Sequence, residues 1–214
     1  MLKFNPRLLS ANSMGEYTWQ KMFVRECPSS TTYLQFAEAD FANGKDARHR
    51  VNAISNAKRS LHMRLEDLCL GFGSVTLSGL RTFPPLLEYI RKCGVVAPAV
   101  LSQLNSLRNM VEHRYEIPTA DEVIMFVGVA SLFLSATDRW KDRQPVEIDY
   151  FQEVLSDGEI WYLFLVKFDW KAGLIRLHFR KKGESGGRCT QTVEFSSPSD
   201  EFFRCVNFAL TNNY

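Results

Sequence analysis

The hydrophobic pattern of this chain changes its period at Pro145, and that change constrains the fold more than any other feature. Before Pro145, apolar residues recur every three or four positions, a spacing that places them on one face of an α-helix. After Pro145, apolar and polar residues alternate, as in β-strands with one buried face. We therefore predict an α+β fold with a run of helices followed by an antiparallel sheet.

Five helices are predicted in the first part of the chain, and they are expected to form a bundle. Thr32 and Gln35 have the spacing of a capping box at the start of the first helix, and Thr119 and Glu122 have the same spacing before the fifth. The fifth helix lacks a polar face, so we expect it to be buried on most sides near the centre of the bundle. The predicted helices cover approximately residues 32–42, 47–68, 84–90, 98–116 and 123–137.

Four strands and a final helix are predicted after the helical part. Turn residues, among them Ser156-Asp157-Gly158-Glu159, separate the strands and indicate a small antiparallel meander. A last helix begins near Ser197-Pro198 and carries five large apolar residues. The predicted strands are 146–155, 160–170, 174–182 and 188–196. The predicted organisation is an N-terminal arm (1–27), a helical domain (28–143), and a domain of sheet plus helix (144–214).

The charge balance limits how the chain could bind nucleic acid. The formal net charge is only +2, from 26 basic and 24 acidic residues, which excludes a polycation that binds through bulk charge. Up to Arg143 there are 18 basic and 14 acidic residues, whereas the remainder has 8 and 10. Any contact with RNA must therefore be local, and the excess of positive charge lies in the helical part.

Cysteine usage and the N-terminal sequence indicate a cytoplasmic protein. The five cysteines are odd in number, widely spaced and without a Cys-x2-Cys pair, so we expect reduced thiols and neither disulfides nor a zinc site. The first residues lack the apolar run of a secretion signal. The longest apolar stretch, residues 123–136, is shorter than a bilayer-spanning helix needs, so we predict no membrane association.

The segment from Leu107 to Tyr115 combines residues that suit the cleavage of RNA. It places a permanent cation, Arg108, beside an amide, Asn109, and five residues before an imidazole, His113. A histidine can transfer a proton near neutral pH, and an arginine can bind a phosphate and stabilise the charge that builds on it. Such chemistry needs no metal ion or other cofactor. An ion pair of Arg108 with Glu112 and a solvated His113 are the structural alternative.

This segment is similar to the Arg-x4-His motif of the HEPN family (higher eukaryotes and prokaryotes nucleotide-binding), in which a polar residue often follows the arginine. The resemblance covers about residues 28–140 and includes the helix around 56–62. It implies a five-helix HEPN-like bundle and a metal-independent endoribonuclease. Arg108, His113 and Asn109 would be the catalytic residues. It also implies a homodimer, in which two copies of the motif face one cleft.

Tyr115 extends the motif to Arg-x4-His-x-Tyr, which resembles HEPN toxins whose antitoxins modify this tyrosine. Tyr115 is thus a candidate modification site, and an antitoxin or other regulatory protein is a candidate partner. Arg114 departs from the pattern, because those toxins usually carry a small residue there. AMP on Tyr115 would block an RNA cleft by its size and charge. A core tyrosine is the structural alternative. The resemblance implies a toxin or an antiviral defence effector.

Further RNA-binding candidates lie outside the motif. Residues on the polar face of the second helix could line the same cleft, although a solvated face explains them as well. In the third strand, basic residues are predicted to alternate outward while apolar residues point inward, which gives a stripe that could follow a phosphate backbone or simply keep the sheet soluble. The helix candidates are His49, Asn52, Asn56 and Arg59, together with Arg114 of the motif. The strand candidates are Arg176, His178, Arg180 and Lys182.

Two alternatives to a nuclease remain open from the sequence. A HEPN-like scaffold could bind a nucleotide, RNA or protein through the same cleft without cutting. A purely structural subunit could use the sheet domain as its docking surface. Convergence of two His113 and two Arg108 side chains across a dimer cleft would favour the nuclease, because a scaffold has no need of it.

Overall fold

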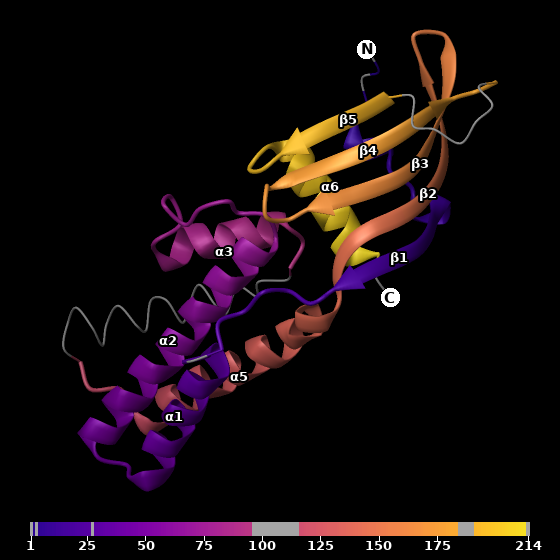
Figure 1. The fold of residues 1–214 in the computed structure, drawn as a ribbon. Coiled ribbons are helices and arrows are strands. Elements are labelled where there is room, and N and C mark those ends of the chain that lie inside the picture. The colour runs from indigo at the N-terminus through magenta and orange to yellow at the C-terminus, as the bar shows by residue number, and fades with distance from the viewer. Residues whose placement is uncertain (1, 3, 27, 96–115, 184–190, 213–214) are drawn as a thin grey trace.

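The computed structural model describes residues 2, 4–26, 28–95, 116–183 and 191–212. The molecule is elongated, with helices packed together at one end and a sheet at the other (Figure 1). Its fold is α+β. The helices of the described residues are α1 (Ser30–Asn43), α2 (Ala47–Gly71), α3 (Phe83–Lys92), α5 (Ala120–Asp142) and α6 (Asp200–Thr211), and short 3-10 turns cover Pro6–Leu8 and Ala11–Ser13.

Capping boxes fix the first residues of two helices. At α5, Thr119 Oγ1 accepts a hydrogen bond from the Glu122 N–H at 3.2 Å, and Glu122 Oε2 accepts one from the Thr119 N–H at 2.7 Å. This box was predicted correctly. At α1 the predicted box of Thr32 and Gln35 is wrong, because Ser29 is the cap and Thr32 is its partner. Both pairs satisfy N–H groups that have no partner inside the helix.

Helices α1, α2 and α5 form a three-helix layer around an apolar core. One face of α2 is completely buried, and its apolar positions follow the spacing of three and four that the sequence shows. α5 contributes Val123, Phe126 and Ala130 to the same core. The fully buried apolar residues of α2 are Ala53, Ile54, Ala57, Leu61, Leu65, Leu68 and Cys69.

Helix α3 connects the helical layer to the sheet end of the molecule. It packs on α2 and on α6. Tyr89 of α3 donates a hydrogen bond to the Phe72 carbonyl at 2.9 Å, and its ring lies edge-on to Phe203 of α6, with 4.9 Å between centroids. The core is therefore continuous from the helical layer into the sheet layer.

The sheet is a five-stranded antiparallel meander. Its order is β1-β2-β3-β4-β5, so each strand pairs with its neighbours in sequence. Asp157 and Gly158, both with positive φ, form the tight turn between the second and third strands, as their sequence predicts. The strands are β1 (Met14–Gln20), β2 (Gln144–Ser156), β3 (Glu159–Asp169), β4 (Leu174–Lys181) and β5 (Gln191–Ser196).

Helix α6 covers one face of the sheet (Figure 1). The residues of β4 that point toward it, Ile175, Leu177 and Phe179, have no exposed surface. They pack in the same cluster as Phe202 and Val206 of α6. We call this the inner face and the opposite one the open face. The predicted alternation of β4, with apolar residues inside and basic residues outside, is confirmed for Arg176, His178 and Arg180.

The prediction of an N-terminal five-helix bundle followed by a small sheet is wrong. The chain enters the sheet before it enters any helix of the bundle, because Met14–Gln20 forms the edge strand β1 beside β2. Four described helices precede β2, and α3 packs mainly on α2 and α6 instead of completing a bundle. The fourth predicted helix, 98–116, lies almost entirely outside the described residues. The alternating run of β1, from Glu16 to Gln20, is only five residues long and was not predicted as a strand.

Helix α5 has an exposed apolar side, contrary to the prediction that it is buried on most sides. Ile124, Met125 and Leu132 are 57%, 45% and 71% exposed, and Gly128 lies on the same side. Of the described helices, α1 and α2 pack on one side of α5, and none covers Ile124, Met125 and Leu132. Among the described residues, α5 is also the one helix long and apolar enough to cross a membrane by length and composition, a test that core helices of soluble proteins also pass.

Candidate functional site

The motif that carries the predicted chemistry lies outside the described residues. This holds for Arg108, Asn109 and His113, and also for Arg114 and Tyr115. Described residues flank the segment on both sides: α3 ends at Lys92, and α5 begins at Ala120. The catalytic and modification roles of the five residues therefore stay predictions.

His49 takes part in the cap of α2. Asp46 is the N-cap residue. Its Oδ1 accepts a hydrogen bond from the backbone N–H of His49 at 3.0 Å, and the same oxygen lies 2.9 Å from His49 Nδ1. The backbone hydrogen bond from His49, together with its ring, lowers the pKa of Asp46 below its ordinary value. His49 is thus held at the start of α2 by a local structural contact.

Asn56 and Arg59 belong to a polar contact between α1 and α2. Asn56 Nδ2 donates to Asp40 Oδ2 of α1 at 2.8 Å, and Arg59 Nη1 donates to Asn56 Oδ1 at 3.0 Å. The Arg59 guanidinium also lies 5.9 Å from the centre of the Tyr33 ring. Asn52 is exposed on the same helix. The structure brings Asn56 and Arg59 together and gives both a structural contact, and their RNA-binding role stays a prediction.

A buried arginine at the centre of the helical layer was missed from the sequence. Arg64 of α2 has a side chain only 1% exposed. Its Nη2 lies 2.9 Å from Asp138 Oδ1 of α5, its Nε donates to Ser30 Oγ at 3.2 Å, and its Nη1 donates to Thr137 Oγ1 at 3.4 Å. The sequence feature that could have predicted its burial is its position three residues after Leu61, on the apolar face of the helix. Arg64 ties α2 to the start of α1 and to the end of α5.

A second ion-pair group fixes the segment after β1. Arg25 Nε lies 2.8 Å from Asp67 Oδ1, and Arg25 Nη2 lies 2.7 Å from Glu66 Oε2. Burial raises the pKa of Asp67, and its pairing with Arg25 only partly offsets this. Burial lowers the pKa of Arg25, but its hydrogen bonds to Asp67 and Glu66 outweigh that effect and raise it. Burial outweighs pairing at Asp67 but not at Arg25, because Asp67, with 2% of its side chain exposed, loses far more hydration than Arg25, with 38%.

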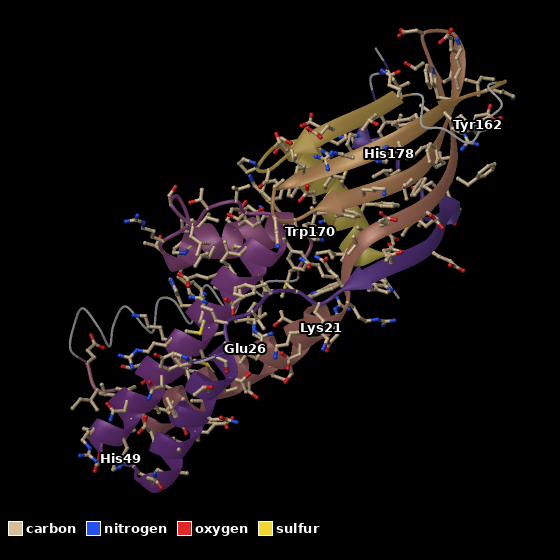
Figure 2. All side chains as sticks on the ribbon, viewed as in Figure 1. Lys21, Glu26, His49, Tyr162, Trp170 and His178 are labelled. Atoms are coloured by element: carbon tan, nitrogen blue, oxygen red, sulfur yellow. The ribbon has the colours of Figure 1, made fainter. Side chains whose placement is uncertain are left out.

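The open face of the sheet divides into two parts with different chemistry. Near the α3 end, its cations have carboxylate partners: Lys167 Nζ lies 2.6 Å from Glu147 Oε1, and Arg176 Nε lies 2.8 Å from Glu194 Oε2. Figure 2 shows the open face with His178 and Tyr162 on it and with His49 at the opposite end of the molecule. The α2 candidates and the open face are therefore separate surfaces.

The other part of the open face is aromatic, and we call it the aromatic end: Phe151, Tyr162, Phe164 and Arg180. The Arg180 guanidinium lies 5.1 Å from the centre of the Phe164 ring. The rings of Phe151 and Tyr162 are 6.0 Å apart and stacked at 15°, and Phe151 is 77% exposed. Cross-strand pairing of Tyr162 with Arg180 confirms that both point to this face, opposite the buried Phe179.

Arg180 differs from the paired cations of the same face. Its Nε is buried and has no hydrogen-bond partner among the described residues. Among those residues, no ion pair with a carboxylate engages it either. His178 lies between the two parts of the face, 6.4 Å from Phe164 between ring centres and 3.2 Å from Thr192 Oγ1 through Nδ1. A cation held beside an aromatic ring without a carboxylate can accept an anion or a π-system from outside.

We expect the stability of the fold to fall when His178 is protonated. Burial, then Lys167 and Arg176, lower the pKa of His178 below its ordinary 6.5, against an opposing effect of Glu147. As the pH falls below 6.5, the unfolded chain binds this proton before the folded chain, so the free energy of unfolding decreases. Denaturant unfolding at about pH 7.5 and about pH 5.5 should show a smaller loss for His178→Gln than for the wild type. Equal losses would contradict this assignment.

Open grooves also lie elsewhere on the described surface, among them two lined by charged residues. One, of about 520 Å³, runs between the first 3-10 turn and α6 and is lined by Arg7, Arg204 and Asp200 among others. The other, of about 760 Å³, lies along residues 21–26, next to the Arg25 pairs. Opposite charges meet in the first groove, and neither holds a group of titratable residues suited to catalysis. Within the described ranges no cluster of His, Cys, Asp and Glu residues could hold a metal ion.

Comparison of the chain with protein-family models, with curated proteins and with solved structures finds no match.

Proposed function

We propose that this protein is a metal-independent endoribonuclease that cleaves RNA through Arg108, Asn109 and His113. The observation that carries the proposal is the Arg-x4-His sequence itself, with Asn directly after Arg. Supporting it, the described helices flank the motif as the resemblance implies: α1 and α2 precede it, and the apolar α5 follows after the capping box at Thr119. The residue types match those that phosphodiester cleavage requires without a cofactor.

The reaction assigned to the motif is an intramolecular transfer at phosphorus. The 2′-hydroxyl oxygen of one nucleotide attacks the adjacent phosphorus, and the bond from phosphorus to the 5′-oxygen of the next nucleotide breaks. His113 exchanges the protons, as the base for the 2′-hydroxyl or the acid for the leaving 5′-oxygen. Arg108 stabilises the negative charge on the non-bridging oxygens, and Asn109 orients its neighbours. The products are a 2′,3′-cyclic phosphate and a 5′-hydroxyl.

The proposed enzyme is a homodimer, because one motif supplies a single histidine and a single arginine. The exposed side of α5 supports this part of the proposal. Ile124, Met125 and Leu132 form an apolar stripe around Gly128, where an added Cβ would meet no atom within 4 Å. A two-fold contact between two such stripes would remove apolar surface from water and let the helices approach closely at the glycine. α5 begins five residues after Tyr115, so this contact would lie near the motif in sequence.

Replacing Leu132 by Glu is expected to convert the dimer to a monomer. A charge at the centre of an apolar contact has no partner and must lose its hydration there. Light scattering coupled to size-exclusion chromatography measures the mass directly. Leu155→Glu is the control, because Leu155 is a leucine of similar exposure, 74% against 71%, on β2. A wild type that is monomeric, or a Leu132→Glu variant that remains dimeric, would contradict the α5 contact.

The proposed activity is tested with a labelled structured RNA in the presence of EDTA. The wild type should cleave it, whereas Arg108→Ala and His113→Ala should not. His62→Gln is the matched control for the loss of one imidazole. If the wild type is as inert as its variants on several RNAs but still binds one of them or a nucleotide, the protein is a binding module instead. The roles as toxin or defence effector, with modification at Tyr115, follow only from the resemblance and depend on this result.

A further inference from the structure

The aromatic end of the sheet is built unlike the rest of its open face. Sheet faces that merely meet solvent carry charged residues in pairs, as Lys167 with Glu147 and Arg176 with Glu194 do here. The aromatic end also has one such pair, Lys182 Nζ with Glu153 Oε2 at 4.0 Å. Beside this pair it exposes most of Phe151 to solvent, and Arg180 lies over Phe164 without a carboxylate partner among the described residues. Exposed aromatic surface, together with a cation that has no carboxylate partner among the described residues, suits a ligand that offers flat rings and negative charge.

We infer that the aromatic end, Phe151, Tyr162, Phe164 and Arg180, binds single-stranded RNA. Unpaired bases stack on aromatic side chains, and phosphates contact arginine, which together make a sequence-tolerant platform for a single strand. The outer side of the Phe151–Tyr162 stack would receive a base, because the two rings are stacked and Phe151 is mostly exposed. Arg180, held over the Phe164 ring, would contact an adjacent phosphate. A duplex cannot use this surface, because its bases are paired and stacked internally.

The inference rests on the proposed function for the choice of RNA over DNA, and it names the substrate class of that enzyme. It does not depend on cleavage. The platform lies on β2, β3 and β4, whereas the motif is in the segment between α3 and α5. The aromatic end would therefore hold the strand by its bases while the motif acts on a phosphodiester. Binding and cleavage can be separated by experiment.

Binding is measured by the fluorescence anisotropy of a labelled 2′-O-methyl oligonucleotide of about 12 nucleotides, in EDTA. This probe lacks the 2′-hydroxyl and cannot be cleaved by the proposed reaction. Phe151→Ala and Arg180→Gln should each weaken binding by about 5- to 100-fold. Arg176→Gln removes the same charge from the same strand, but from an arginine that is already paired with a carboxylate. Phe36→Ala removes an exposed phenylalanine from α1. Both controls should change the affinity by less than about twofold.

Three results would overturn the inference. The wild type could fail to bind the oligonucleotide, Arg176→Gln could weaken binding as much as Arg180→Gln, or a duplex of the same sequence could bind as tightly as the single strand. The first points to a protein ligand or none, and the other two to bulk charge. If Phe151→Ala and Arg180→Gln lose binding although the wild type never cleaves RNA, RNA binding at the aromatic end is supported and the proposed nuclease activity is contradicted. If the wild type cleaves single-stranded RNA and these two variants cleave and bind equally well, the nuclease activity is supported and RNA binding at the aromatic end is contradicted.

Discussion

Replacing His113 by alanine is expected to slow RNA cleavage by about 10² to 10⁴-fold, the contribution typical of a positioned general acid or base. The variant should bind RNA with nearly unchanged affinity, because the imidazole acts on protons that move only in the transition state. Single-turnover rates with enzyme in excess measure the effect without interference from product release. The wild-type rate should also depend on pH near neutrality, and this dependence should disappear in His113→Ala.

Two controls make the result interpretable. His113→Ala must unfold at the same denaturant concentration as the wild type and must keep the same mass in solution. Arg108→Lys keeps the charge but loses the planar fork that contacts two phosphate oxygens, so it should also be slow. Retention of the wild-type rate by a folded His113→Ala variant would remove the histidine from the mechanism.

Replacing Arg64 by alanine is expected to lower the free energy of unfolding by about 2 to 5 kcal/mol. The guanidinium lies at the centre of the helical layer and contacts Asp138, Ser30 and Thr137. Its removal leaves a cavity and a buried hydroxyl that loses its partner. Since domains are typically stable by about 5 to 15 kcal/mol, the variant should lose a large share of its stability. Urea unfolding followed by circular dichroism measures the difference.

Two further substitutions separate charge from volume at this position. Arg64→Met fills most of the space, and Asp138 is half-exposed and can be hydrated, so this variant should recover much of the loss. Arg91→Ala removes an exposed arginine paired with Glu88 and should leave the free energy of unfolding close to the wild-type value. An Arg64→Ala variant as stable as Arg91→Ala would show that the buried contacts contribute little.

Local signals in the sequence predicted individual elements better than their arrangement. The strands β2 to β5 and the Asp157-Gly158 turn follow from alternation and from residues that accept positive φ. The edge strand β1 was not predicted, because its alternating run is only five residues long and its pairing with β2 joins residues far apart in the sequence. The bundle prediction failed for a related reason: the packing of α3 on α6 is a contact between residues far apart in the sequence, which no periodicity reports.

The candidate sites show the same limit. The outward direction of Arg176, His178 and Arg180 could be predicted from alternation alone. Their different partners could not, because these depend on the register with the neighbouring strands, which places Glu194 opposite Arg176 and Tyr162 opposite Arg180. In α2, the basic residue Arg64 lies on the apolar face. A hydrophobic pattern does not predict that a charged residue at such a position is part of the core.

The central claim, RNA cleavage by 2′-hydroxyl attack without a metal, is tested most directly by the ends of the products. The wild type is incubated in EDTA with an end-labelled RNA, and with the same RNA carrying one 2′-deoxynucleotide at the cleaved position. We predict fragments that end in 2′,3′-cyclic phosphate and 5′-hydroxyl, and no cleavage at the deoxy position. Fragments with 5′-phosphate ends, cleavage at the deoxy position, or activity that appears only with an added divalent ion would contradict the claim.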